Sequence, residues 1–182
     1  MKIYIMRHGK TVWNEKNITQ GRAQNRLSKE GKAETQQAAL QNKNTEFDVI
    51  ISSPLMRTMQ TANIMNKYHN VEIIKDKDLT EIDQGIFTGR HINEYSVDDL
   101  KLKKARSKSV GMETYIECYN RLKNFADKLK TYSYKNMLIV THKCPAIYLE
   151  MALNNQPFKE PEYMDDVFKN SFKNSQIKMI EI

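Results

Sequence analysis

The sequence predicts a single-domain α/β fold, a three-layer α/β/α sandwich with a mostly parallel sheet. Two observations support this prediction. Short apolar runs alternate along the chain with stretches of helical spacing, and no linker, repeat or low-complexity tract divides them. The 182 residues suit one domain, residues 1–182, and a hydrophobic content of 40% is enough to build a core.

The apolar runs are the predicted strands. Those at residues 3–6, 48–54, 71–74 and 137–141 have the length of buried strands, and the second ends in turn residues. Residues 176–181 alternate between apolar and polar side chains, which is typical of a half-exposed edge strand.

Helices are expected between these strands. Residues 28–41 combine alanines with Lys, Glu and Gln behind Ser28, a plausible N-cap. Residues 55–68 have helical spacing, and residues 115–129 form a long amphipathic pattern. Pro145 stands where the first turn of a helix accepts proline. Residues 79–89 are loop-rich.

Composition excludes several function classes. The net charge is +7, but most of the cations are lysines scattered along the chain without a binding motif, so nucleic acid is not the expected partner.

No apolar run has the length of a membrane span, and no secretion signal is recognisable at Met1, so we expect a cytoplasmic protein with no membrane partner. Cys118 and Cys144 are expected to stay reduced.

Reactive side chains follow three of the predicted strands. Arg7 and His8 follow the first, the Ser52-Ser53-Pro54 turn with Arg57 follows the second, and His142 follows the fourth. Because ligands bind beyond the carboxyl ends of parallel strands, these groups are expected to converge. Two histidines beside two arginines suit a phosphate group, since neutral His is a nucleophile and Arg pairs with planar anions.

At this point the sequence resembles the histidine phosphatase superfamily, whose best-known branch is the phosphoglycerate mutases. The resemblance implies the phosphoglycerate mutase-like fold and covers nearly the whole chain, with the motifs in the family's order. These motifs are Arg7-His8-Gly9-Lys10-Thr11 with Asn14, Gln20-Gly21-Arg22, Leu27-Ser28-Lys29-Glu30-Gly31, residues 52–62 around Arg57, residues 79–85 with Gly89, and Val140-Thr141-His142.

The resemblance implies a role for each site residue. His8 is the nucleophile that becomes phosphorylated, and Arg7, Arg57 and a protonated His142 hold the transferring phosphoryl group. Glu81 is the general acid and then the base that activates water, for which its pKa should be raised; Asp83 is the fallback. No metal and no cofactor are expected. The candidate substrate-binding residues are Arg7, Asn14, Gln20, Gly21, Arg57 and Lys143.

The expected activity is that of a phosphomonoester phosphatase acting on a small phosphorylated metabolite. A phosphoglycerate mutase is the alternative within the fold, although residues 91–111 are short for the lid that a mutase needs. A non-catalytic phosphate-binding module is the alternative from another class. The substrate and the oligomeric state stay open.

Three residues near the predicted site carry further expectations. Lys10 and Lys143 should lie near the mouth of the pocket, where a cation would attract a second anionic group of the substrate, although each could be a solvated lysine. Cys144 precedes Pro145 at a helix N-terminus, which favours a thiolate. The alternative is an inert residue packed behind the site.

Overall fold

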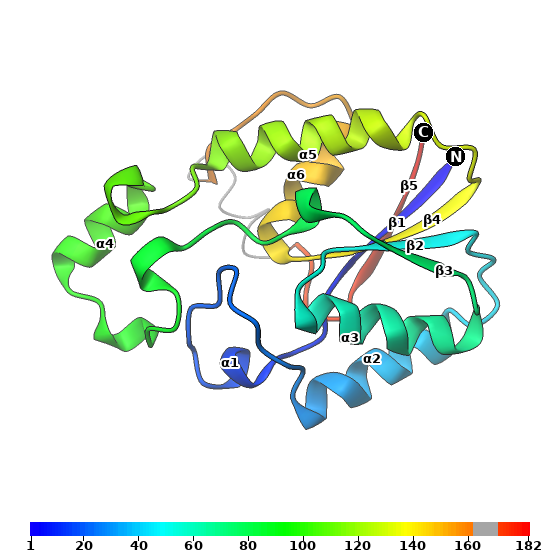
Figure 1. Ribbon diagram of the computed structural model, residues 1–182, viewed down its shortest axis with the longest axis horizontal. Coiled ribbons are helices and arrows are strands. Elements are labelled where there is room, and N and C mark those ends of the chain that lie inside the picture. The colour runs from blue at the N-terminus through cyan, green and yellow to red at the C-terminus, as the bar shows by residue number, and fades with distance from the viewer. Residues whose placement is uncertain (162–170) are drawn as a thin grey trace.

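A five-stranded sheet separates two layers of helices in the computed structural model, which describes residues 1–161 and 171–182 (Figure 1). The strand order is β3-β2-β4-β1-β5, in which β5 pairs antiparallel with β1 and the other pairs are parallel. The predicted α/β sandwich with a mostly parallel sheet is therefore confirmed. The strands are β1 (Lys2–Arg7), β2 (Val49–Ser52), β3 (Glu72–Lys75), β4 (Asn136–Thr141) and β5 (Ile177–Glu181).

The longer helices cover the two faces of the sheet. Helices α5 and α6 lie on one face and α2 and α3 on the other, whereas α1 and α4 lie beyond one end of the sheet (Figure 1). The region predicted as one helix over residues 55–68 is α3 followed by a 3-10 turn over residues 66–68. The α-helices are α1 (Val12–Glu15), α2 (Lys29–Gln41), α3 (Met56–Met65), α4 (Val97–Lys104), α5 (Tyr115–Leu129) and α6 (Lys143–Leu153).

The alternation of side chains along β1 divides the core between the two faces. Ile3 and Ile5 are fully buried in the cluster that contains Leu122 of α5. Met6 points to the other side and joins the cluster that contains Ala39 of α2 and residues of α3. Because neighbouring side chains of a strand face opposite sides, an almost continuous apolar run can serve both layers.

Helices α1 and α4 were not expected from the sequence, and their composition explains why. Helix α1 is only four residues long and is held by a capping box between Thr11 and Asn14. Helix α4 begins with a capping box between Ser96 and Asp99 but buries none of its residues. A helix without an apolar face leaves no hydrophobic period in the sequence.

The carboxyl ends of three parallel strands meet at one edge of the sheet. Arg7 of β1 lies opposite Thr141 of β4, and the backbone N–H of His8 donates to the Thr141 carbonyl at 3.0 Å. The backbone N–H of Ser53, just after β2, donates to the Val140 carbonyl at 3.0 Å. The predicted convergence of the strand ends is confirmed, and it brings the two catalytic candidates His8 and His142 together.

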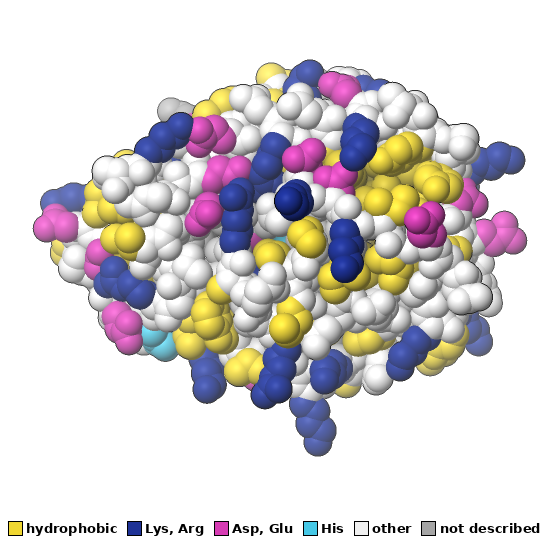
Figure 2. Space-filling model, in the orientation of Figure 1, with side chains coloured by type: hydrophobic (Ala, Val, Ile, Leu, Met, Phe, Trp, Pro, Cys, Tyr) yellow, Lys and Arg dark blue, Asp and Glu magenta, His cyan; other side chains and the backbone are white. Residues whose placement is uncertain are grey.

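Figure 2 shows no large cluster of side chains with the same charge on the face that it displays. Lys and Arg side chains are spread over the face shown, and acidic side chains lie among them. None of the helices in the described ranges is long and apolar enough to cross a membrane.

Ser28 caps α2 as predicted: its Oγ accepts a hydrogen bond from the Gly31 backbone N–H at 3.0 Å, and the residue is 3% exposed. We expect Ser28→Ala to lower the free energy of unfolding by about 1 kcal/mol, because a buried N–H loses its acceptor. Urea unfolding measures this change. Ser28→Gly should cost only a few tenths of a kcal/mol. Equal losses in the two variants would show that the cap is not the cause.

Candidate active site

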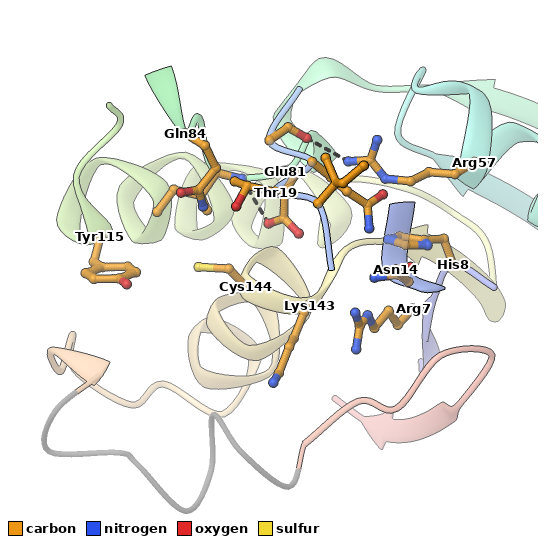
Figure 3. A pocket seen from close by; sticks show the side chains of 14 residues that line it. Arg7, His8, Asn14, Thr19, Arg57, Glu81, Gln84, Tyr115, Lys143 and Cys144 are labelled. Carbon is orange, nitrogen blue, oxygen red and sulfur yellow. Dashed lines mark hydrogen bonds between the residues drawn. The ribbon is translucent and has the colours of Figure 1, made fainter. Parts of the chain in front are cut away.

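A cavity of about 460 Å³ opens at the edge of the sheet where the three strands end. Its walls come from the end of β1, the loop before α2, the start of α3, residues 81–84, and the first turns of α5 and α6 (Figure 3). Its lining residues are Arg7, His8, Asn14, Ile18, Thr19, Gln20, Gly21, Arg57, Glu81, Ile82, Gln84, Tyr115, Lys143 and Cys144.

His8 is held in one tautomer by its own backbone. Its Nδ1 lies 2.7 Å from the Gly9 carbonyl oxygen, and because a carbonyl oxygen only accepts, Nδ1 must carry the proton. The lone pair is therefore on Nε2. Burial of the 2%-exposed ring, together with the charges of Arg57 and Arg7, holds the pKa of His8 well below its usual range. The side chain is a neutral imidazole at neutral pH.

His142 is the N-cap residue of α6 and does not line the cavity, but its ring centroid lies 5.2 Å from that of His8. Its Nδ1 accepts from Nε of Arg57 at 3.2 Å, so Nε2 carries the proton and donates to Ser53 Oγ at 2.9 Å. Burial and then the charge of Arg57 hold the pKa of His142 well below its usual range. The ring is thus neutral in this site, in contrast to the expected protonated form.

Arg57 is fully buried and ties three segments together. Besides its bond to His142, its Nη1 donates to the Ala23 carbonyl at 2.8 Å and its Nη2 to the Gly21 carbonyl at 2.7 Å. Burial lowers the pKa of Arg57 to about 10, although the charge of Glu81 opposes the shift. The guanidinium keeps two further N–H groups for a ligand, because it has five donors and uses one at each of three nitrogens.

Two more donors face the cavity from the N-terminal segment. Arg7 donates from Nη1 to the Phe172 carbonyl at 3.0 Å, while its buried Nε has no hydrogen-bond partner among the described residues. The Oδ1 of Asn14 accepts from both the N–H and the hydroxyl of Thr11, so its amide NH₂ is turned away from that cap. Both side chains can therefore donate to an anion in the cavity.

The Gly21 turn strongly favours glycine. Gly21 has a φ of +45°, and a Cβ there would lie 2.7 Å from Thr88 Oγ1. The turn presents the Gly21 carbonyl to Arg57 and places Gln20 in the cavity wall, with a buried Oε1 that has no partner among the described residues. A residue with a side chain would strain this turn and move the arginine's acceptor.

Glu81 is the single carboxylate among the described residues that line the cavity, and its Oε1 accepts from the Ile82 backbone N–H at 2.9 Å. In Figure 3 the carboxylate faces the same space as His8 and Arg57. Lys143, in the first turn of α6, also lines the cavity, and burial followed by the charge of Arg7 lowers the pKa of this lysine. The part of the lining that the structure describes thus contains two arginines, one lysine and one carboxylate.

Two sequence expectations, those for Lys10 and Cys144, did not hold. Lys10 pairs with Glu30 at 2.9 Å and does not line the cavity. Asp83 also lies outside the lining, where its Oδ1 accepts from the Gly85 N–H. Cys144 lines the cavity but is buried, and burial raises its pKa well above the usual range, so the predicted thiolate is wrong. The inert packed residue, the alternative, agrees better with this environment.

The sequence analysis missed one wall of the cavity. Thr19, Gln84 and Tyr115 line it, yet Tyr115 was interpreted only as part of an apolar helix face. Gln84 lies inside a quoted motif, but no side-chain pattern singled it out. Positions of this kind become visible only when the loops that carry them are placed in space.

Among the described residues, no three His, Cys, Asp or Glu side chains are grouped so that they could hold a metal ion. The described cationic groups that line the cavity are three side chains of the protein: Arg7, Arg57 and Lys143.

Comparisons with known proteins agree with this geometry. The histidine phosphatase superfamily (branch 1) matches residues 3–166. Phosphoserine phosphatase 1 of Hydrogenobacter thermophilus is 31% identical over 160 residues, which cover 84% of this chain and 76% of the relative. A probable phosphoglycerate mutase, GpmB, of Cronobacter sakazakii is 33% identical over 99 residues, which cover 54% of this chain but only 46% of that relative.

Solved structures show the same fold. A putative alpha-ribazole-5'-P phosphatase from Escherichia coli str. K-12 substr. MG1655 superimposes with a TM-score of 0.87 at 21% identity, covering 100% of this chain and 91% of that one. The phosphatases among the relatives support a phosphomonoester hydrolase. The family match spans residues 3–166 and so includes His8, Arg57 and His142. The chain therefore belongs to the histidine phosphatase superfamily.

Proposed function

We propose that the chain is a metal-independent phosphatase that hydrolyses the phosphomonoester of a small metabolite through a phosphohistidine on His8. The observation that carries this proposal is the fixed tautomer of His8. Its Nδ1–H is bound to the Gly9 carbonyl, so the Nε2 lone pair is available beside two arginines in the cavity. A nucleophile that is already neutral needs no base to activate it.

In the first step, Nε2 of His8 attacks phosphorus while the bond from phosphorus to the ester oxygen breaks. Protonated Glu81 gives its proton to that oxygen, and the alcohol leaves. In the second step, Glu81 removes a proton from water as the water oxygen attacks phosphorus. The P–N bond breaks, its electron pair returns to Nε2, and inorganic phosphate is released.

Charge in the cavity stabilises the transferring group. Arg7 and Arg57 donate to the equatorial oxygens, where negative charge spreads in an in-line transition state, and Asn14 adds a neutral donor. The same arginines depress the pKa of both histidines in this site. A bound phosphate dianion would offset this positive charge, because opposite charges in one cavity stabilise each other.

His8→Ala should reduce turnover of p-nitrophenyl phosphate below detection, because the covalent step loses its nucleophile. In the unchanged protein, rapid quenching of a ³²P-labelled substrate should trap acid-labile, base-stable label on His8, with or without EDTA. Peptide mapping locates the label. Label on Ser53 or Cys144, or none at all in a protein that still turns over, would contradict the mechanism.

Glu81→Gln should slow the hydrolysis of an alkyl phosphate by about 10²–10⁴-fold, because the leaving oxygen loses its general acid. The first step with a dinitrophenyl phosphate should be much less affected, since that leaving group needs little protonation. The burst of dinitrophenol measures this step. Asp83→Asn, a change outside the cavity, is the matched control; a larger loss in Asp83→Asn than in Glu81→Gln would reassign the acid.

Replacing Lys143 tests whether this residue favours substrates with a second anionic group. A second anionic group on the substrate stabilises the ammonium form of Lys143, although the contact is screened over a Debye length of about 8 Å. Lys143→Ala should raise KM for a substrate with a second anionic group about two- to fivefold, the range of an exposed ion pair, with kcat nearly constant. Steady-state kinetics at two salt concentrations measure this effect. Equal changes for a neutral-tailed substrate would remove Lys143 from the recognition surface.

The reaction product distinguishes a phosphoglycerate mutase from the proposed phosphatase. A phosphotransferase would return the phosphoryl group to an organic acceptor, whereas the proposed hydrolase gives it to water. A non-catalytic binding module would release no phosphate and would bind inorganic phosphate without forming the covalent adduct.

A further inference from the structure

The backbone around Glu81 is held by charged side chains that lie outside the cavity lining. Arg22 Nε donates to the Glu81 carbonyl oxygen at 3.1 Å. Two residues later, the Asp83 backbone N–H donates to Oε2 of Glu113 at 3.2 Å. Neither Arg22 nor Glu113 is among the described residues that line the cavity. The loop that carries Glu81 is therefore fixed by groups set back from the space where a substrate would bind.

Glu113 is the centre of these contacts. Its Oε1 accepts from Arg121 Nε at 2.7 Å, and its Oε2 accepts from Arg121 Nη2 and Arg22 Nη2, both at 3.1 Å. With the Asp83 N–H, the carboxylate accepts four hydrogen bonds, and its side chain is only 11% exposed. An amide of the same shape has a single oxygen, so its NH₂ would face at least one of these donors.

Arg121 connects this carboxylate to the segment that precedes Glu81. It lies in α5, and its Nη1 donates to the Asp78 carbonyl oxygen. Although burial opposes the shift, the hydrogen bonds to Glu113 raise the pKa of Arg121 above its usual value. Two parallel N–H···O bonds to one carboxylate fix the plane of a guanidinium, so Glu113 sets the direction of Nη1. Glu113 therefore acts on the loop both before and after Glu81.

The Glu81 carboxylate follows the position of this backbone. Its Oε1 accepts from the N–H of the next residue, Ile82, at 2.9 Å. Within the described residues, no hydrogen bond joins the Glu81 carboxylate to another side chain. A general acid must come within about 2.6–3.2 Å of the oxygen that it protonates. A small shift of the loop would thus be enough to impair the transfer of the proton.

We propose that Glu113 is a positioning residue for the proton transfer by Glu81, and that it acts through Arg121 and through its own bond to the loop. This inference rests on the role of Glu81 in the proposed function. Among the described hydrogen bonds of the Glu113 carboxylate, none reaches His8 or the two arginines of the cavity. The attack on phosphorus and the protonation of the leaving oxygen should therefore respond differently when Glu113 is changed.

Glu113→Gln separates protonation of the leaving group from the rest of the reaction. Release of the alcohol from an alkyl phosphate in the first turnover should slow by about 10- to 100-fold, because a displacement of about 1 Å is enough for such a loss. Release of dinitrophenol from a dinitrophenyl phosphate, whose leaving group needs little protonation, should be nearly constant. Rapid quenching measures both rates. A purely structural role would slow both substrates alike, and that unchanged ratio would overturn the proposal.

A double variant tests whether Glu113 acts through Glu81. Once Glu81→Gln has removed the acid, no proton transfer is left to position. Adding Glu113→Gln should then slow the alkyl phosphate hardly further, whereas two independent residues would multiply their separate losses. Multiplied losses in the double variant would refute the positioning role.

The proposed function and this inference fail in different ways. Full activity of Glu81→Gln on an alkyl phosphate would remove the acid from the proposed function, and with it the group that Glu113 positions. A slow Glu81→Gln beside an unchanged Glu113→Gln would leave the proposed function intact and refute the positioning role alone.

Two further variants separate positioning from folding. Arg121→Lys keeps the charge but cannot bind one carboxylate through two parallel N–H groups, so it should shift the ratio in the same direction as Glu113→Gln. Glu150→Gln removes another partly buried carboxylate, which pairs with Lys178 at 3.0 Å, and it should leave the ratio constant. Equal ratios for Glu113→Gln and Glu150→Gln would contradict the proposal. If Glu113→Gln fails to fold by circular dichroism, Arg121→Lys against Glu150→Gln decides the question by the same ratio.

Discussion

The burial of one guanidinium organises the active site. Arg57 is 0% exposed, and it donates to His142 and to the carbonyls of Gly21 and Ala23. A buried cation is costly unless its donors are satisfied, so the Gly21 turn and the neutral Nδ1 of His142 are required by it. The arginine thereby sets the tautomer of one histidine, adds to burial in lowering the pKa of the other and holds the Gly21 turn in the cavity wall.

This arrangement prepares the site for an anion. Both histidines are kept neutral by burial and by the arginines, and the pKa of Arg7, of Arg57 and of Lys143 is lowered as well. Burial is the largest cause of each shift, so these cationic groups lie in a poorly solvated space, where an anion beside them would be stabilising. Stability that the fold loses by collecting these charges is recovered as binding and transition-state stabilisation when the ligand arrives.

The sequence predicts the part of the site that secondary structure alone positions. His8 and His142 follow strands whose apolar runs are plain, and parallel strands must end at one edge, so their meeting could be foreseen. The protonation of His142 and the state of Cys144 could not, because both depend on burial and on neighbours distant in sequence. Helix α4 has no buried face, so neither it nor the contacts of Lys103 with Gln84 left any periodic signal.

The two ends of the cavity are therefore built by different means. Strand ends and Arg57 fix the phosphate end, whereas residues 103–115 fix the opposite wall through Arg106. The junction between them is tight: Gly85 has a φ of +52°, and a Cβ there would lie 1.9 Å from the Val110 carbonyl oxygen. Glu81 and Gln84, three residues apart, thus belong to one loop but are held by separate supports. The contacts that hold Gln84, from Lys103 and Arg106, are thus separate from those that hold His8, Arg7 and Arg57.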